Sequence, residues 1–267
     1  MKPSGVITIT TDFGHKGPFA GVMKGVILSR FADAKVVDLA HDIPAQWPPE
    51  AGFWVSRSYA WFPHGTVHLA IVDPGVGTER DILIAEVDGH VFIAPDNGLL
   101  GPLLDNAESP RVVKLVPSRT EALRLPAASA TFHGRDIFAP IAAEIAAGRV
   151  SANELGDEVA TWTPGWLDEP ETADGRISGV IVTIDAFGNL ISNIDASLLE
   201  DFREPVASIG GHQIPMLLTY GRAKPGDLLA LVNSFDVVEV AKAEGSAAEG
   251  LGSDRGAPIV IREGYNT

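Results

Sequence analysis

Residues 6–14 read VITITTDFG, and this stretch decides the fold class of the protein. Val6–Thr11 is β-branched at every position, and an uninterrupted run of this kind predicts a buried strand. The strand ends at Asp12-Phe13-Gly14, which predicts a loop. In open α/β sheets ligands bind beyond the carboxyl ends of the strands, so this loop is a candidate site.

Helical and strand patterns alternate downstream of this strand to about residue 150. Helices are expected over residues 19–31, 49–62, 97–106 and 136–147, and strands over 35–39, 66–72, 82–87 and 91–94. Asp88-Gly89, between the last two strands, is a hairpin signal. The alternation predicts an α/β domain with a mostly parallel sheet, over residues 1–165.

The pattern changes in the second half of the chain. Residues 151–176 carry Pro and Gly interruptions and two tryptophans, which is typical of a connector. Short β runs then follow one another, which predicts a small barrel or sandwich over residues 172–267. The runs are 178–185, 189–194, 206–209, 212–218, 228–232, 237–241 and 258–262.

Composition excludes several classes of protein. The 267 residues include 20 Lys+Arg and 35 Asp+Glu, a net charge of −15, which argues against nucleic acid and anionic membranes as partners. Because there is no cysteine, disulfides, thiolate metal sites and a Cys nucleophile are excluded. No apolar run approaches the ~18 residues of a membrane span, and the first residues lack the apolar core of a signal peptide. We therefore expect a cytoplasmic protein.

Three candidate residues of the first domain follow predicted strands or precede a predicted helix. Asp12 can accept two hydrogen bonds from a ribose diol, or it can stabilise its own loop as an Asx-turn. Asp73 lies in IVDPGVGTER, and Arg80, seven residues on, can fold back and pair with it. His133 lies in ATFHGRDIF, where Asp136 is a natural N-cap for the next helix. A loop histidine held by hydrogen bonds is the structural alternative for His133.

The second domain offers a loop with three chemically distinct groups. Asp185, Phe187 and Asn189 present a carboxylate, an aromatic ring and an amide, which suit an amino acid head group and an adenine-like ring. A plain β-turn is the alternative. Ser234 and Glu239 flank another strand, and each is uninformative alone.

Taken in order, seven motifs are similar to those of one known family. They are TDFG (11–14), H-x-I-P (41–44), VDPGVGT (72–78) with Arg80, PDNG (95–98), TFHGRD (131–136), D-x-F-G-N (185–189) and NS…E-x-A (233–241). Together they resemble the S-adenosyl-L-methionine (SAM) hydrolases, also called SAM hydroxide adenosyltransferases. These enzymes are similar to the SAM-dependent fluorinase and chlorinase. The resemblance spans residues 6 to about 262.

The resemblance implies a fold, a reaction and an assembly. It implies an N-terminal α/β domain, a C-terminal β-barrel and a homotrimer with active sites between subunits. Asp73, Arg80 and His133 match the triad that places and activates water, which the halide-using relatives lack. The implied reaction is attack of water on the ribose C5′ of SAM, giving adenosine and L-methionine, without cofactor or metal.

The resemblance also implies roles in substrate binding. Asp12 would hold the ribose hydroxyls, and Asp185 would meet the methionine ammonium. Phe187 and Asn189 would contact the adenosine, and Ser234 and Glu239 the methionine end. Asn97, in the PDNG motif, is expected to contact the substrate as well.

The leaving group determines which chemical groups the site must supply. Methionine departs from a charged sulfur as a neutral thioether, so neither a general acid nor a metal is needed. The site needs a positioned water and an acceptor for one proton, and either Asp73 or His133 could be that acceptor.

Two other classes of function compete with this interpretation. A metal-dependent phosphohydrolase could gather Asp12, His15, His41, Asp42, Asp96 and His133 around divalent ions. A non-catalytic SAM or adenosine sensor could use the same pocket.

Two positions depart from the family's pattern. Trp47 stands where a polar residue is usual, and Lys242-Ala243-Glu244-Gly245 replaces an Asn-Gly pair. Both positions bear on the expected adenine and methionine contacts.

Overall fold

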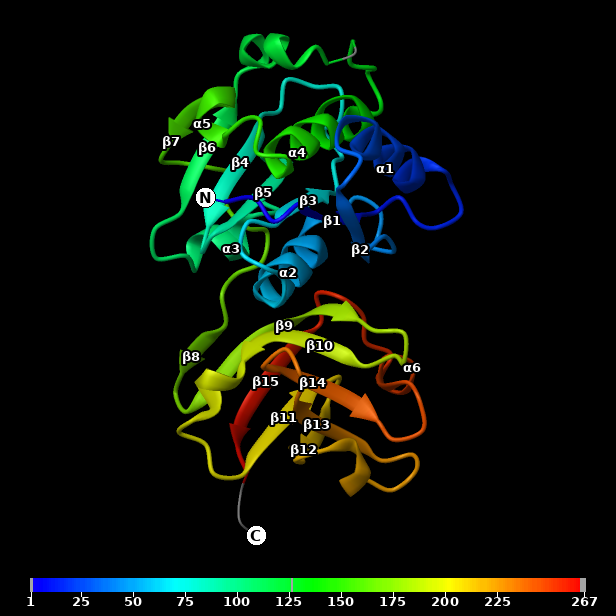
Figure 1. Ribbon diagram of the computed structural model, residues 1–267. Coiled ribbons are helices and arrows are strands. Elements are labelled where there is room, and N and C mark those ends of the chain that lie inside the picture. The colour runs from blue at the N-terminus through cyan, green and yellow to red at the C-terminus, as the bar shows by residue number, and fades with distance from the viewer. Residues whose placement is uncertain (1, 126, 265–267) are drawn as a thin grey trace. The chain divides into compact units, whose positions relative to one another are not determined.

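The computed structural model describes residues 2–125 and 127–264. The chain divides into two compact units, Met1–Trp166 (unit 1) and Leu167–Thr267 (unit 2), which Figure 1 shows as ribbons. Each unit has its own sheet and its own apolar core.

The sheet of unit 1 has the strand order β2-β1-β3-β5-β4-β6-β7. The strands are β1 (Val6–Thr11), β2 (Lys35–Ala40), β3 (Val67–Ile71), β4 (Ile82–Val87), β5 (His90–Pro95), β6 (Arg111–Leu115) and β7 (Gly156–Val159). Strands β2, β1, β3 and β5 are parallel. Strands β4 and β7 run against the other five, so the sheet is mixed. The α/β class is confirmed, and the antiparallel part begins at the β4–β5 hairpin, where Asp88 and Gly89 both have positive φ.

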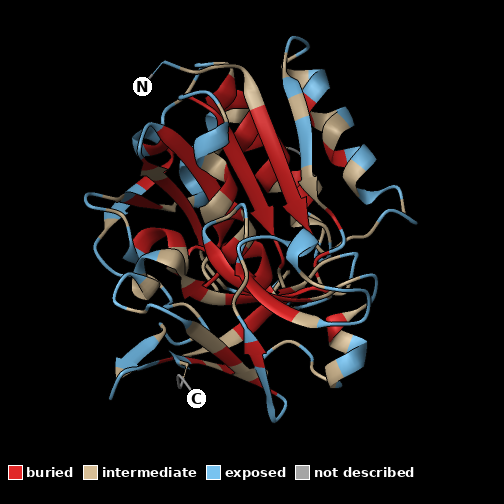
Figure 2. Cartoon of the chain, turned by 90° about the horizontal axis from the view of Figure 1, so that it is seen from below, coloured by how far each residue is buried: buried red, intermediate tan, exposed pale blue. Residues whose placement is uncertain are grey.

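Helices cover both faces of this sheet (Figure 1). On one face α1 (Phe19–Arg30) and α4 (Ala139–Ala146) pack on a cluster that includes Ile7 and Ile9. On the other face α2 (Pro48–Ser58) and α3 (Gly101–Asp105) pack on a cluster that includes Ala70 and Phe92. Residues 7–11 are all buried, as the β-branched run predicts, and Figure 2 shows buried strands beside helices with exposed outer faces.

Short elements complete unit 1. They are the 3-10 turns η1 (Tyr59–Trp61) and η2 (Pro117–Leu123), the π-helical turn η3 (Gly134–Phe138) and helix α5 (Ala152–Leu155). Helix α5 and strand β7 lie where we expected only a connector. Ser151 and Glu154 cap α5 reciprocally, and β7 takes its hydrogen bonds from β6.

Unit 2 is an antiparallel sheet with the order β12-β11-β15-β9-β10-β14-β13, and β8 pairs with β9. The strands are β8 (Glu171–Ala173), β9 (Arg176–Ile184), β10 (Leu190–Asp195), β11 (Pro205–Ile209), β12 (His212–Pro215), β13 (Leu228–Val232), β14 (Val237–Lys242) and β15 (Pro258–Glu263). Its helical elements are η4 (Ala196–Leu199), η5 (Tyr220–Arg222) and α6 (Ala247–Leu251). A bridge between Met216 and Ala230 brings the end beyond β12 to β13, so the sheet is a nearly closed barrel. This confirms the expected barrel.

None of the helices in the described ranges is long and apolar enough to cross a membrane.

Candidate functional site

The first group of candidate residues gathers at the carboxyl ends of β1 and β3. Thr11 and Ile71 are partners in this parallel pair, so the loops that begin with Asp12 and carry Asp73 leave the sheet side by side. A pocket of about 250 Å³ opens there. Its lining includes Asp12, Asp73 and His133 beside aromatic rings from Phe13, Phe19 and Phe132.

Arg80 joins Asp73 to His133. Its Nε donates to both carboxylate oxygens of Asp73, at 3.1 and 2.9 Å, and one terminal nitrogen donates to the carboxylate as well. The same terminal nitrogen lies 3.1 Å from Nδ1 of His133. The guanidinium also lies over the ring of Phe138, 5.5 Å from its centroid. The three residues therefore form one connected unit at the pocket.

The contact with Arg80 fixes the tautomer of His133. A guanidinium has donors and no acceptor, so Nδ1 of His133 must accept, and in the neutral ring Nε2 carries the hydrogen. Burial and the charge of Arg80 lower the pKa of His133, against the opposing effect of Asp73 and Asp136. His133 is consequently a neutral ring near pH 7, with an N–H donor opposite its contact with Arg80.

The two loops that carry the triad meet at Gly77. This glycine has φ +80°, and a Cβ on it would lie 2.2 Å from the carbonyl oxygen of Ala130. Only a residue without a side chain allows this approach.

Asp136 does not cap a helix as expected. His133 occupies the position before the first turn, and that turn is π-helical. The carboxylate of Asp136 accepts instead from the backbone N–H of Ser129, at 2.8 Å.

Asp12 and Asn97 are the other two residues of unit 1 that the sequence predicted for the site. Asp12 lines the pocket and accepts from the backbone N–H of Gln46 at 3.0 Å, which leaves carboxylate lone pairs for a ligand. Asn97 donates to the carbonyl of Val72 at 2.8 Å and accepts from the N–H of Leu99. Its amide therefore holds the backbone just before Asp73.

The second group lies in unit 2. One oxygen of Asp185 accepts from the backbone N–H groups of Phe187 and Asn189, both at 2.9 Å. The other oxygen accepts from the Asn189 amide, also at 2.9 Å. The ring of Phe187 is left 78% exposed, so this loop presents an aromatic face beside a fixed carboxylate. Ser234 is exposed on the loop that precedes β14.

Glu239 is buried on β14 and is held by two donors. Tyr220 donates its hydroxyl at 2.6 Å, and Asn233 donates its amide at 3.1 Å. Burial raises the pKa of Glu239, the two hydrogen bonds oppose this, and the charge of Asp185 adds to it. Asp185 and Glu239 therefore share one electrostatic environment, which favours a cation between or beside them.

Sequence reasoning missed Tyr220. The contact between Tyr220 and Glu239 spans 19 residues and starts from a short turn, η5, so no local pattern announces it.

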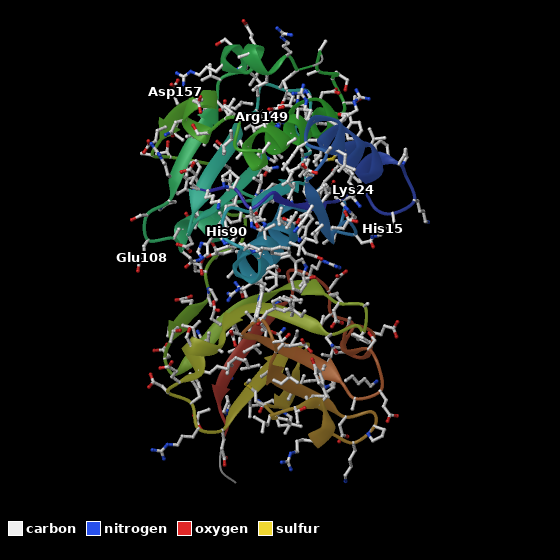
Figure 3. All side chains as sticks on the ribbon, in the orientation of Figure 1. His15, Lys24, His90, Glu108, Arg149 and Asp157 are labelled. Carbon is white, nitrogen blue, oxygen red and sulfur yellow. The ribbon has the colours of Figure 1, made fainter. Side chains whose placement is uncertain are left out.

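The residues of the metal-dependent alternative do not converge. Both ring nitrogens of His41 are engaged, with Thr11 at 2.8 Å and Asp38 at 2.9 Å. His15 pairs with Asp42 on an exposed loop, where Figure 3 labels it, and Asp96 accepts from the N–H of Thr163. In residues 2–125 and 127–264 no three His, Cys, Asp or Glu side chains are grouped as metal ligands.

The two departures from the family pattern lie in different surroundings. Trp47 packs edge-on against Trp166, with ring centroids 6.2 Å apart. Glu244 adopts the left-handed conformation, with φ 55°, in the turn after β14. Asn adopts this conformation far more readily than Glu does.

Comparisons with known proteins agree across both units. Residues 7–156 match the model of the SAM hydroxide adenosyltransferase N-terminal domain, and residues 179–260 match the C-terminal domain. The chain is 37% identical to an (R)-S-adenosyl-L-methionine hydrolase of Thermus thermophilus, over 97% of this chain and 99% of the relative. A fluorinase of Actinopolyspora mzabensis is more distant, at 24% identity over 91% of this chain and 92% of the relative.

A solved structure has the same fold. It is an uncharacterized conserved protein from Thermotoga maritima, with a TM-score of 0.88 and 29% identity, and the match covers 96% of this chain and 100% of that one.

Proposed function

The chain belongs to the SAM hydroxide adenosyltransferase family, and from this we propose that it hydrolyses SAM to adenosine and L-methionine. The observation that carries the proposal is the unit of Asp73, Arg80 and His133 at one pocket. The name of the Thermus thermophilus relative specifies the R configuration. We therefore propose the (R) epimer at sulfur as the preferred substrate.

The proposed step is an in-line displacement at C5′. The water oxygen forms a bond to C5′ while the bond from C5′ to sulfur breaks, and the sulfur keeps the electron pair. Methionine leaves as a neutral thioether, and the attacking water gives up one proton. Alignment of water, C5′ and sulfur lowers the barrier, because freedom of motion is lost on binding and not at the transition state.

We propose Asp73 as the acceptor of that proton. The Nδ1 of His133 faces a guanidinium, so protonation of His133 would place two donors against each other. The pKa of His133 is lowered as well, which makes it a poor acceptor. In the proposal His133 donates from Nε2 to the water and orients it, while Asp73 removes the proton.

The proposed binding contacts use groups in both units. Asp12 would hold the ribose diol with the oxygens that Gln46 leaves available. Asp185 and Glu239 would hold the methionine ammonium, and the exposed ring of Phe187 would stack on the adenine. Asn189 and Ser234 complete this proposed surface.

We also propose a homotrimer in which unit 1 of one subunit and unit 2 of its neighbour form each active site. The division of the candidate residues between two units supports this. The cytoplasm remains the compartment predicted from the sequence.

The test is product analysis in ¹⁸O-labelled water with chelator present. We expect L-methionine, and adenosine with one ¹⁸O at its 5′-hydroxyl. The (R) epimer should react faster than the (S) epimer, and added chloride or fluoride should give no 5′-halo-adenosine. Asp73→Asn protein is the matched control. Methylthioadenosine or S-adenosylhomocysteine as products would refute the proposal, because other bonds are then cleaved.

A further inference from the structure

We infer that Asp136 is a positioning residue that holds His133 in place through the loop of residues 129–136. This inference rests on the proposed function, because it concerns how one member of the triad is oriented. Asp136 itself lies outside the residues that line the pocket.

Asp136 closes a ring of hydrogen bonds around His133. Its carboxylate accepts from the N–H of Ser129 at 2.8 Å, and the hydroxyl of Ser129 accepts from the N–H of Phe132 at 3.1 Å. The carbonyl of Phe132 then accepts from the N–H groups of Arg135 and Asp136. His133 lies inside this closed segment, so its backbone has little freedom.

The carboxylate is buried yet charged. Arg135 donates to both of its oxygens, at 2.6 and 3.0 Å. This pairing lowers the pKa of Asp136 to about 2, against the effect of burial. The bonds from Arg135 and from the N–H of Ser129 offset the cost of burying an ionised carboxylate.

The π-helical turn η3 connects Asp136 to His133. Single π-helical turns are frequent at functional sites. Here the turn η3 starts directly after His133 and contains Asp136. The same guanidinium of Arg135 lies 5.2 Å from the ring centroid of Phe132, which lines the pocket.

The loop is also fixed from outside. Ala130 contacts Gly77 of the loop that carries Asp73 and Arg80. We expect loss of the Asp136 clamp to change the position of His133 relative to Arg80, because the clamp joins Ser129 and Asp136 on either side of His133. Because a displacement of about 1 Å in a catalytic group can cost ~100-fold in rate, the clamp is expected to act on kcat.

The test compares Asp136→Asn with Glu144→Gln. Glu144 is another buried carboxylate, and it is paired with two arginines, Arg30 and Arg149. Arg149 follows helix α4 in the chain and is labelled in Figure 3. We expect Asp136→Asn to lower kcat by roughly tenfold or more, with KM for SAM changed less than about twofold. We expect Glu144→Gln to lower the melting temperature and leave kcat unchanged.

The same substitution made in His133→Ala protein separates a positioning role of Asp136 from a general loss of structure. In His133→Ala protein, addition of Asp136→Asn should cost less than about twofold in kcat, because residues that act as one unit are non-additive. The acid limb of the kcat profile should also move to lower pH in Asp136→Asn alone, since the charge of Asp136 raises the pKa of His133. An equal loss in both backgrounds, or an unmoved acid limb, would overturn the inference.

The milder variant Ser129→Ala keeps the test valid if Asp136→Asn fails to fold. It removes only the acceptor for the Phe132 N–H. We expect a smaller loss of kcat in the same direction, again absent in the His133→Ala background. Failure of the proposed function is distinguishable, because wild-type protein would then release no adenosine from SAM.

Discussion

At the scale of single residues, Arg80 determines what its neighbours can do. One guanidinium donates to the Asp73 carboxylate and to Nδ1 of His133. Arg80 thereby keeps the Asp73 carboxylate an acceptor, and it leaves His133 with an N–H donor at Nε2. Lysine could not replace it, because an ammonium lacks the planar fork that reaches both partners.

The first prediction tests the assignment of His133 as a donor. Asn places an acceptor where Nδ1 faces Arg80, and Gln places a donor near Nε2. His133→Asn and His133→Gln should each retain at least about tenfold more activity than His133→Ala. Single-turnover rates with labelled SAM measure this, and calorimetric titration checks that affinity is unchanged. Equal inactivity of all three variants would make His133 the proton acceptor.

The second prediction concerns Glu244, which holds a left-handed backbone conformation. Glu244→Asn should raise the free energy of unfolding by up to about 1 kcal/mol, because Asn tolerates this conformation. Glu244→Ala is the control, since it removes the same charge but keeps the strain. Denaturant titration measures both, and equal stabilisation by Ala would assign the effect to charge.

At the scale of elements, the hydrophobic pattern of the sequence predicted the buried strand β1 but did not predict strands β6 and β7. The strand at residues 6–11 is buried on both faces and was predicted within its observed bounds. Strands β6 and β7 were missed, because RVVKL and GDEV carry no clear alternation of apolar residues. The helix expected over residues 97–106 is confined to Gly101–Asp105, since Asn97 uses its side chain to hold the backbone.

The candidate site was predictable to a similar degree. The ordered motifs, through the family they resemble, singled out Asp73, Arg80 and His133, and the structure brings these three side chains into contact. The π-helical turn after His133 and the contact between Tyr220 and Glu239 depend on tertiary packing. No window of sequence contains that information.

The third prediction arises from a histidine pair across β3 and β5. His68 contacts Thr8 at 2.8 Å and His90 at 3.1 Å, and burial with the neighbouring His90 lowers its pKa to about 3. Burial and the charge of His64 lower the pKa of His90, and Asp88 opposes this. Figure 3 labels His90 in unit 1.

These shifts determine the sign of the pH dependence. The unfolded chain binds protons at histidine near pH ~6.5, and folded His68 does not until about pH 3. The contribution of His68 to the free energy of unfolding should therefore be fully present above pH ~6.5. Below that pH it should fall by about 1.4 kcal/mol per pH unit. His68→Gln should reduce that slope, whereas a change at the exposed His212 should not. Denaturant titrations between pH 7 and 4 measure the slopes, and equal slopes for all three proteins would contradict the prediction.

At the scale of the whole molecule, the candidate residues are divided between two units, whose boundary along the chain lies between Trp166 and Leu167. Asp12, Asp73, Arg80 and His133 belong to unit 1. Asp185, Phe187, Asn189, Ser234 and Glu239 belong to unit 2.

The fourth prediction uses this division to test the proposed trimer. Asp73→Ala and Asp185→Ala proteins should each be inactive, and subunit exchange between them should restore activity. With random exchange at equal amounts, about one site in four combines two intact halves, so recovery should approach a quarter of the wild-type rate. Light scattering measures the assembly, and mass spectrometry verifies the exchange. Exchanged subunits without any recovery would rule out sites between neighbours.

The same division has a consequence for how such enzymes diversify. In the proposed function, the groups that choose the nucleophile belong to unit 1, and those that grip the methionine end belong to unit 2. A lineage can therefore exchange water for another nucleophile by altering one unit, while its hold on the methionine end of the sulfonium substrate is inherited unchanged from the other.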